Sequence, residues 1–167
     1  DLVIEECDDL FTKVFVRERA RALGIPVLMV TDDRGLVDVE RFDLEPDRPL
    51  FHGLAGDLDA SRLKGLATKD KVPYVMRILG AETMTDRFAG SLVEIDETLK
   101  SFPQLASEAT LSGSLAADVA RRLLLGSLTV SGRWWVDLEA LVADGSGGVR
   151  PDDRPLEVPV SDEARRA

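Results

Sequence analysis

The first 31 residues alternate two apolar runs with one amphipathic stretch, and this alternation limits most strongly what the chain can fold into. Residues 1–7 open on an apolar run, and residues 26–31 form a continuous β-prone run. Between them, Asp8 and Asp9 precede a helix-like stretch that ends at Gly24. Unbroken apolar strands are typical of a parallel sheet that is covered on both faces. The segment therefore predicts a β-α-β unit and an α/β fold.

The next stretch predicts a return along the sheet and then an irregular connection. Residues 32–35 have the composition of a tight turn, in which Gly35 takes a positive φ. Residues 36–42 alternate weakly between apolar and charged side chains, so they predict a half-exposed strand in a hairpin or at the sheet edge. Prolines and glycines recur between residues 45 and 56 and leave no helical period, which predicts a surface loop.

Helical patterns dominate the middle of the chain. Residues 59–105 carry helix-like pieces at 60–67, at 69–79 and at 92–102, and Pro73 interrupts the second of them. These pieces predict a helical insert in the α/β domain.

A long amphipathic helix and a short aromatic strand follow the insert. Residues 106–125 predict the strongest helix of the chain, since Gly126 follows as a stop and apolar side chains recur at steps of four: Leu111, Leu115, Val119 and Leu123. Residues 133–138 predict a short strand that begins with two tryptophans after an arginine.

The ends of the chain predict that it is cut from something longer. It begins at Asp1 and enters an apolar strand at once. We assign residues 1–142 to the α/β domain. Residues 143–167 are rich in glycine and proline and then charged, so they predict a linker and a tail toward a following domain.

Length, charge and cysteine usage narrow the classes of function. The 167 residues argue for one domain with a real core. The formal charge of -10 opposes attraction to phosphate backbones, so we expect no nucleic-acid partner. No apolar run approaches the ~20 residues of a membrane helix and no signal peptide opens the chain, so we expect no membrane partner and a cytoplasmic location. Cys7, the lone cysteine, fits a reducing compartment.

Acidic residues gather where the first predicted strand meets the first helix. Glu5, Glu6, Asp8 and Asp9 lie within five positions of one another. In open α/β sheets ligands bind outside the carboxyl ends of the strands, so this place favours a functional site. Carboxylates this close repel an anionic substrate unless a hard cation such as Mg²⁺ lies between them. The alternative interpretation is structural, in which Asp8 or Asp9 caps the helix.

The residues around this junction resemble a known family. Residues 1–13, followed by a helix and a second strand, are similar to the middle of the ThiF/MoeB/HesA adenylyltransferases, the bacterial relatives of ubiquitin-activating enzymes. Asp8 falls where the family's Asp contacts Mg-ATP. Lys13 falls on the family's Arg, one helical turn on, so the positive charge is kept there. Asp9 falls on the family's Asn, so a carboxylate replaces a neutral amide at that position.

The likeness spans most of residues 1–142 and is weakest in the insert. Residues 47–51 are similar to the family's Asp-x-Pro-x-Tyr segment, residues 112–126 resemble its Gly-Ser-Leu-x-Ala helix with a leucine-rich turn, and residues 132–137 resemble the strand that follows. The chain looks most like the subgroup that is fused to a nitroreductase-like flavin domain. That resemblance implies that the tail leads into such a domain.

The resemblance also implies a fold, an activity and a site. The fold is a Rossmann-like, mostly parallel sheet, and the activity is the ATP-dependent activation of a carboxylate as an acyl-adenylate. ATP and Mg²⁺ are the implied cofactors. Asp8 is the implied catalytic residue and metal ligand, and Asp8, Thr12 and Lys13 are the implied nucleotide contacts. The implied partners are a carboxylate substrate or a small carrier protein, and a second copy of the chain, because the family commonly pairs through these sheets.

Three parts of the family pattern are missing from this sequence. No G-x-G-x-x-G occurs, so most ATP contacts are expected upstream of Asp1 and this chain alone is expected to be inactive. Many members bind structural zinc through two cysteine pairs, but the first pair would fall at Leu50 and Gly53, so we expect no zinc. The family's reactive cysteine is also absent, because Cys7 lies on a predicted buried strand, where a thiol behaves as a small hydrophobe.

Two other classes of function stay open. A phosphoacceptor receiver domain has similar strands, with Thr31 as its switch hydroxyl, but its acceptor Asp should close the first strand, where this chain has Glu5 and Glu6. A noncatalytic domain of the same family could dock a partner or a flavin domain, and Asp9 in place of Asn favours that alternative. His52 has no second histidine or cysteine nearby and is assigned no role.

Overall fold

The computed structural model describes residues 1–143 except 81–82, 96 and 101–102. The chain divides into two compact units, Asp1–Asp137 and Leu138–Ala167. The second unit contains the short helix α6 (Leu138–Leu141). From residue 144 on, the predicted linker and tail lie outside the described residues.

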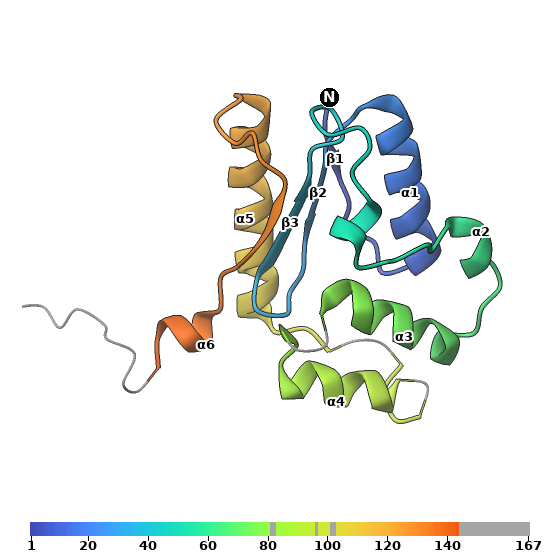
Figure 1. The fold of residues 1–167 in the computed structure, drawn as a ribbon. Coiled ribbons are helices and arrows are strands. Elements are labelled where there is room, and N and C mark those ends of the chain that lie inside the picture. The colour runs from blue at the N-terminus through green and yellow to red at the C-terminus, as the bar shows by residue number, and fades with distance from the viewer. Residues whose placement is uncertain (81–82, 96, 101–102, 144–167) are drawn as a thin grey trace, which may run out of the picture. The chain divides into compact units, whose positions relative to one another are not determined.

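The first unit is built on a four-stranded sheet in the order β1-β2-β3-β4 (Figure 1). The strands are β1 (Val3–Ile4), β2 (Val27–Val30), β3 (Leu36–Glu40) and β4 (Gly132–Trp135). The predicted α/β class is confirmed. The expectation of a mostly parallel sheet needs correction, because β1 and β2 are parallel but β3 runs antiparallel to both β2 and β4.

The tight turn after β2 explains why the sheet turns antiparallel. Arg34 and Gly35 lie in the connection between β2 and β3, residues 31–35, and have φ values of 56° and 52°, which is the left-handed conformation. Gly35 is required for a second reason, since a Cβ there would lie 2.8 Å from the carbonyl oxygen of Val136. The predicted positive φ of Gly35 is confirmed.

One helix covers each face of the sheet. Helix α1 (Leu10–Leu23) begins at an Asp9 cap and ends at Gly24, which has a φ of 62°. Helix α5 (Ala106–Leu124) packs on β2 and β3, as its apolar stripe predicted. The strand residues alternate between two cores: Val27 joins the α1 core, and Leu28 joins the α5 core. Burial on both faces is why β2 is apolar throughout.

Strand β3 is buried rather than half-exposed as predicted. All of its residues are buried. Val37 and Val39 pack in the α5 core, while Asp38 and Glu40 lie on the other face against basic side chains. The predicted alternation of apolar and polar side chains is present, but the polar side chains face buried basic groups and not water. Carboxylates tolerate burial only when they are paired in this way.

The predicted surface loop at 45–56 also contributes to the core. It contains a 3-10 turn, η1 (Leu50–Gly53), in which Leu50 and Phe51 are buried. Phe51 is fully enclosed in the α1 core. The prolines and glycines predicted the irregular backbone correctly, but the apolar side chains between them determine the burial.

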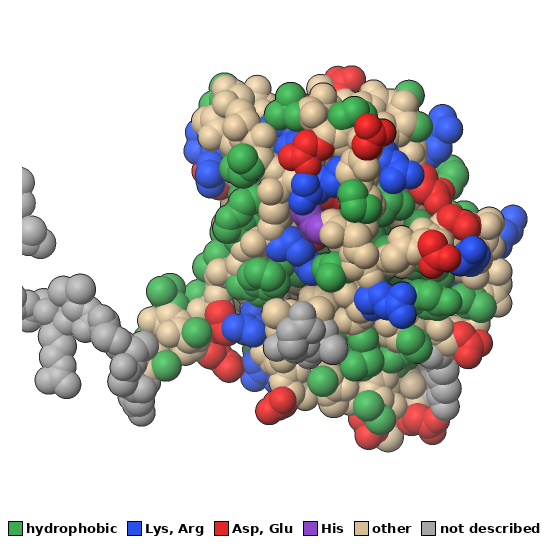
Figure 2. All heavy atoms as spheres, viewed as in Figure 1, with side chains coloured by type: hydrophobic (Ala, Val, Ile, Leu, Met, Phe, Trp, Pro, Cys, Tyr) green, Lys and Arg blue, Asp and Glu red, His purple; other side chains and the backbone are tan. Residues whose placement is uncertain are grey.

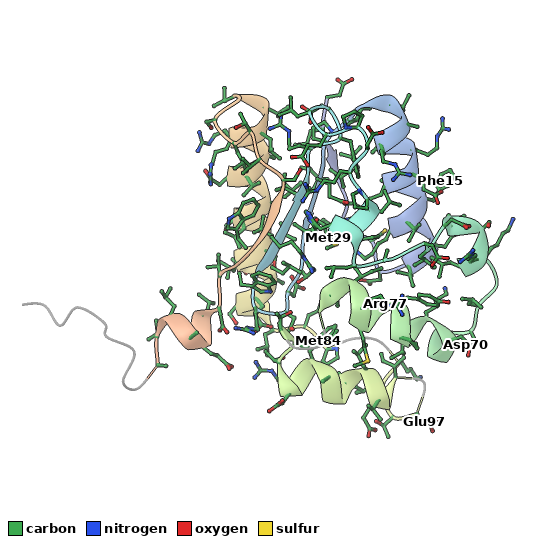
Figure 3. The ribbon with its side chains drawn as sticks, viewed as in Figure 1. Phe15, Met29, Asp70, Arg77, Met84 and Glu97 are labelled. Atoms are coloured by element: carbon green, nitrogen blue, oxygen red, sulfur yellow. The ribbon has the colours of Figure 1, made fainter. Side chains whose placement is uncertain are left out.

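The predicted insert contains three helices, α2 (Ala60–Leu63), α3 (Thr68–Leu79) and α4 (Asp86–Glu94). Pro73 lies inside α3 without interrupting it. The helix predicted at 92–102 overlaps α4 only at residues 92–94, and its later described residues are not helical, because the Thr85 side chain caps a helix that begins at Asp86 and ends at Glu94. Met29 lies deep beside these helices, while Phe15 lies on the outer side of α1 (Figure 3).

Candidate functional site

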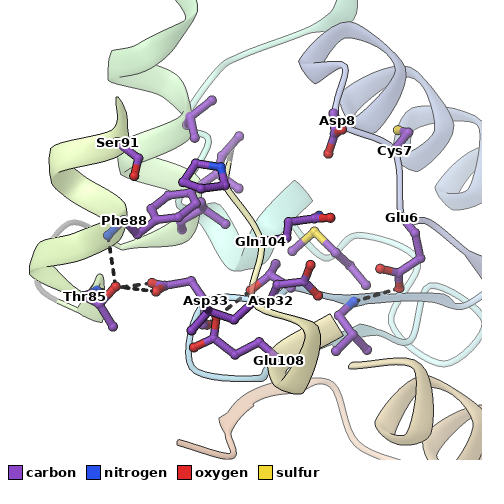
Figure 4. A pocket seen from close by; sticks show the side chains of 18 of the residues that line it. Glu6, Cys7, Asp8, Asp32, Asp33, Thr85, Phe88, Ser91, Gln104 and Glu108 are labelled. Carbon is purple, nitrogen blue, oxygen red and sulfur yellow. Dashed lines mark hydrogen bonds between the residues drawn. The ribbon is translucent and has the colours of Figure 1, made fainter. Parts of the chain in front are cut away.

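A cavity of about 230 Å³ opens at the carboxyl ends of β1 and β2. The residues that follow these strands line one side of it, and α3 and α4 line the other. Figure 4 shows the strand-end residues Glu6, Cys7 and Asp8 opposite Thr85, Phe88 and Ser91 of the α4 region. Segments far apart in the sequence therefore meet at the edge of the sheet where α/β proteins bind ligands.

Asp8 and Asp9 have separate tasks. The Asp9 carboxylate accepts hydrogen bonds from the backbone N–H of Thr12 at 2.9 Å and from its hydroxyl at 2.8 Å. These bonds, aided by Lys71 at 3.3 Å, lower the pKa of Asp9. Asp8 lines the cavity and makes no hydrogen bond or ion pair with the described part of the chain. The predicted cap is Asp9, and Asp8 is left available to a ligand.

The structure does not bring Thr12 into the cavity. Its hydroxyl and its N–H both bind Asp9, and it is not among the lining residues. Lys13 does line the cavity, but its ammonium group lies 2.9 Å and 3.2 Å from the two carboxylate oxygens of Glu5. Of the three predicted nucleotide contacts, Asp8 and Lys13 thus share one cavity, and the charge of Lys13 is already partly neutralised.

Glu5 links the cavity to a buried ion cluster, by which we mean Lys13, Glu5, Arg17 and Glu40. Arg17 donates to Glu5 at 2.6 Å and to Glu40 at 2.7 Å, and no part of its side chain reaches solvent. Burial alone would raise the pKa of Glu5, but Lys13 and Arg17 outweigh it and lower the pKa to about 2. Glu5 is therefore a permanent anion that orients Lys13 and Arg17.

The same cluster holds the η1 turn in place. Glu40 accepts the backbone N–H of Phe51 at 2.6 Å, and the Arg17 guanidinium lies 4.0 Å from the centre of the Phe51 ring. Phe51 has a φ of 49°, which is costly for a residue with a large side chain. The buried charges thus stabilise a strained turn on the face of the sheet away from α5.

Glu6 lines the cavity, and its electrostatic surroundings differ from those of Glu5. It accepts the backbone N–H of Val30 at 3.0 Å and has no ion-pair partner in the described part of the chain. Although part of the residue is open to solvent, burial of the carboxylate, with Glu5 and Asp32 nearby, raises its pKa to about 7. Glu6 can therefore gain or lose a proton near neutral pH.

Asp32 and Asp33 follow β2 and line the cavity. Asp33 is hydrogen-bonded within the fold, as Asp9 is, whereas Asp32 resembles Asp8. Asp33 accepts the hydroxyl of Thr85 at 2.6 Å and its backbone N–H at 3.2 Å, which fixes the start of α4. Asp32 has no such partner in the described residues. Sequence reasoning assigned both to a tight turn. The positional rule that indicated the acids after the first strand also points to Asp32.

Cys7 does not lie on a buried strand as predicted. Strand β1 ends at Ile4, and Cys7 is partly exposed at the cavity, with its Sγ 2.9 Å from a Glu5 carboxylate oxygen. Burial of the thiol and the adjacent Glu5 raise the pKa of Cys7 to about 11. The thiol is therefore protonated at neutral pH and is a poor nucleophile.

His52, the one histidine of the chain, has a structural position. Its Nδ1 accepts from Arg48 Nε at 3.2 Å, and its Nε2 lies 3.1 Å from Asp38. Figure 2 shows it at the surface among basic and acidic side chains. Both ring nitrogens are engaged within the fold, which agrees with the absence of an assigned role.

The described residues contain no group of three or more histidine, cysteine, aspartate or glutamate side chains that could hold a metal ion. Mg²⁺ does not need such a group, because it is usually held by one or two carboxylates together with waters and phosphate oxygens. Asp8 and Asp32 line the same cavity without a hydrogen-bond or ion-pair partner among the described residues, and carboxylate oxygens are of the donor type that Mg²⁺ takes. The cationic groups of the cavity lie beside carboxylates, Lys13 at Glu5 and Arg87 3.8 Å from Glu108.

Comparison with known proteins gives one informative similarity. Over 140 residues the chain is 54% identical to the uncharacterized protein MT1398 of Mycobacterium tuberculosis (strain CDC 1551 / Oshkosh). The match covers 84% of this chain and 20% of that protein, so the chain spans about a fifth of the length of the curated relative it matches. No family model and no solved structure matches the chain. None of the described helices is long and apolar enough to cross a membrane.

Proposed function

We propose that this chain is the C-terminal part of a ThiF/MoeB/HesA-like adenylyltransferase domain, which activates a carboxylate as an acyl-adenylate. The observation that carries the proposal is that Asp8 and Asp9, although adjacent, have different surroundings. Asp9 caps α1, while Asp8 lines the cavity at the carboxyl ends of β1 and β2 with no protein partner. Asp8 is open to solvent, and its carboxylate oxygens are ligands of the kind that Mg²⁺ takes from proteins, which supports a metal ion bound there.

In the proposed reaction an oxygen of the substrate carboxylate forms a bond to the α-phosphorus of ATP. The bond from that phosphorus to the bridging oxygen breaks, and pyrophosphate leaves with the electron pair. Mg²⁺ would neutralise the phosphate charge that develops during this displacement. The substrate carboxylate is already ionised at neutral pH, so the protein needs no general base.

The residues of this chain would act by positioning and by charge. Asp8 and Asp32 would bind the metal side of the nucleotide, because they are the carboxylates of the cavity without partners in the described residues. Lys13 would offset negative charge at the cavity wall, and Glu5 fixes its ammonium group at 2.9 Å. Glu6, with a pKa of about 7, would lose its charge as the pH falls and so reduce repulsion of the phosphates.

The remaining parts of the proposal rest on the resemblance. We propose that the glycine-rich nucleotide-binding half precedes Asp1 in the complete protein, that a nitroreductase-like flavin domain follows the tail, and that the protein works as a homodimer in the cytoplasm. The larger size of the mycobacterial relative is compatible with further domains. The domain boundary proposed at residue 142 lies close to the end of the first compact unit at Asp137.

ATP-pyrophosphate exchange tests this function directly. The assay uses the protein extended upstream by its glycine-rich half, with candidate carboxylates, Mg²⁺ and labelled pyrophosphate. We expect exchange in the wild type and its loss in Asp8→Asn, which keeps the size of the side chain and removes the charge. Asp9→Asn is the matched control, because an asparagine also caps a helix and restores the family's own residue. Equal exchange in Asp8→Asn and wild type would sink the assignment of Asp8.

A second candidate is a noncatalytic domain of the same family that docks a partner or a flavin domain. The observation that favours it is the engagement of Lys13, whose charge is committed to Glu5. Under this alternative the extended protein shows no exchange with any carboxylate and no binding of Mg-ATP by calorimetry. Binding of Mg-ATP that Asp8→Asn abolishes would exclude it as the sole function.

A further inference from the structure

The cavity has two chemically different sides. The strand ends contribute the carboxylates described above, whereas α3 and α4 contribute an apolar patch beside the polar side chains of Thr85, Arg87 and Ser91. We call this patch the apolar wall and define it by Val75, Ile78, Leu79 and Phe88, which all line the cavity. The helical insert, which matches the family least, therefore supplies half of the site.

Hydrogen bonds tie the α4 part of the apolar wall to the turn after β2. The start of α4 is held by the two Asp33–Thr85 hydrogen bonds, and Arg34 donates to the backbone oxygen of Thr83 at 2.8 Å. The Thr85 hydroxyl also caps the helix at the N–H of Phe88. Because these bonds join α4 to the hairpin turn after β2, the Phe88 ring needs little reorganisation to receive a ligand.

The size of the cavity limits what can occupy it. Its volume of about 230 Å³ corresponds to about seven or eight water-sized groups, at about 30 Å³ for each water molecule. This is slightly less than the roughly 300 Å³ at which pockets for drug-sized ligands begin. The cavity is therefore suited to a short alkyl or aryl group.

We propose that the apolar wall binds the apolar body of a small amphiphilic ligand, and that Phe88 determines which chain length fits. The identification of this ligand as the carboxylate substrate rests on the adenylyl-transfer activity proposed above. The substrate class is then a short aliphatic or aromatic carboxylate. The glycine-rich tail of a carrier protein is the competing occupant, and it would leave the apolar wall largely uncovered because glycine has no side chain.

Calorimetric titration of the full-length protein tests the proposal with two series of probes. The first series is the straight-chain carboxylates from propanoate to decanoate in the presence of Mg-ATP, and the second is the 1-alkanols of the same lengths without nucleotide. Each methylene that enters the wall should raise the affinity about fourfold, since its burial contributes about 0.8 kcal/mol. The gain should stop when about seven carbons fill the cavity. A flat series for both probes overturns the proposal.

Variants of α4 locate the effect. Phe88→Ala should weaken the longer probes by about tenfold and leave propanoate unchanged, and Phe88→Leu, which keeps an apolar side chain and hence the fold, should lie between. Val93→Ala is the matched control, because Val93 lies on the same helix and is 76% exposed to solvent. Equal losses for short and long probes in Phe88→Ala, or a loss in Val93→Ala, would contradict a role for Phe88 in chain-length selection.

The two proposals fail separately in this design. The alkanols report on the apolar wall alone, and pyrophosphate exchange reports on activation. A chain-length dependence without exchange overturns the adenylyltransferase and supports the apolar site. Exchange without a chain-length dependence supports the enzyme and overturns the apolar site, and tighter binding of a glycine-rich peptide than of hexanoate then identifies the carrier tail as the occupant.

Discussion

Glu5 and Glu6 are neighbours in the sequence, and the structure places them in two regions with opposite electrostatics. Glu5 belongs to the buried ion cluster, where Lys13 and Arg17 hold its pKa at about 2. Glu6 belongs to the cavity, where burial without an ion-pair partner among the described residues raises its pKa to about 7. Successive residues of an extended chain point to opposite sides, and this alone separates the two carboxylates.

The difference teaches how to distinguish structural acids from functional ones in this fold. Glu5 and Glu40 each have arginine at 2.6 to 2.7 Å, and Asp9 and Asp33 each accept two hydrogen bonds from a threonine. These acids maintain the structure. Asp8, Asp32 and Glu6 border a cavity without a cationic partner in the described residues, and such unpaired acids mark sites that bind ligands or protons.

Removal of Arg17 should have the largest effect on the ion cluster. Arg17→Met keeps the length of the side chain but leaves Glu5 and Glu40 as buried anions, so the free energy of unfolding should fall by about 3–5 kcal/mol. Urea unfolding at pH 7 measures the loss. Arg19→Met, on the exposed side of the same helix, should change stability by less than about 0.5 kcal/mol. Similar small losses in both variants would refute a structural role for the cluster.

Lowering the pH should reveal how much the ionised Glu5 carboxylate contributes to the free energy of unfolding. The folded pKa of about 2 lies below the ordinary value of 4.5, so the ionised carboxylate stabilises the fold above pH 4.5. As the pH falls from 4.5 toward 2, Glu5 becomes protonated in the unfolded chain but stays ionised in the folded chain. About 3 kcal/mol of the free energy of unfolding is therefore lost. Unfolding free energies measured across this window should show the loss, and Glu5→Gln should show it already at pH 7. Parallel pH profiles for the variant and the wild type would contradict the assignment.

The comparison of the two regions also explains which parts of the fold could be predicted. The β-α-β opening, the turn at Gly35 and the α5 helix are encoded by local periodicity and by glycine, and the sequence predicted them. The burial of β3 could not be predicted, because its Asp38 and Glu40 are paired with arginines that lie distant in the sequence. A polar alternation has the same appearance whether it faces water or a buried guanidinium.

The site was predictable to a similar extent. The position after the first strand indicated the acids of residues 5–9 as a group, and the family resemblance then selected Asp8. The positional rule also covers Asp32, which follows β2. The wall formed by Phe88 and its neighbours on α3 could not be anticipated, since it depends on the Asp33–Thr85 contact, which spans 52 residues. The α4 helix was also misplaced, because the Thr85 cap is a weaker local signal than the apolar residues after it.

Loss of the Thr85 hydroxyl should have an intermediate effect and act on the cavity side alone. Thr85→Val keeps the shape of the side chain but removes both the cap and the bond to Asp33, so the free energy of unfolding should fall by about 1–2 kcal/mol. Amide hydrogen exchange should become faster in α4 and stay unchanged in α1. Thr110→Val, an exposed helix position, is the control and should alter stability by less than about 0.5 kcal/mol.

Neutralising Glu6 should give a smaller effect of the opposite sign. Its folded pKa of about 7 lies above the ordinary 4.5, so the folded chain binds more protons between these values and loses stability as the pH rises through them. Glu6→Gln keeps an acceptor for the Val30 N–H and removes this cost. The variant should therefore be more stable than wild type at pH 8 and equal to it at pH 4 in thermal unfolding. A gain of the same size at both pH values would show that charge is not the cause.

The smallest change in stability should come from Asp8→Asn, and its smallness is the informative result. Asp8 has no protein partner among the described residues, so its replacement should alter the free energy of unfolding by less than about 0.5 kcal/mol. Asp9→Ala, one residue on, should cost about 1 kcal/mol because it removes the α1 cap. Millimolar Mg²⁺ with ATP should then raise the melting temperature of the wild type and of Asp9→Asn but not of Asp8→Asn, since a ligand stabilises only the fold that binds it. If Asp8→Asn instead destabilises the protein as much as Asp9→Ala does, Asp8 belongs with the structural acids and the proposed metal site loses its main support.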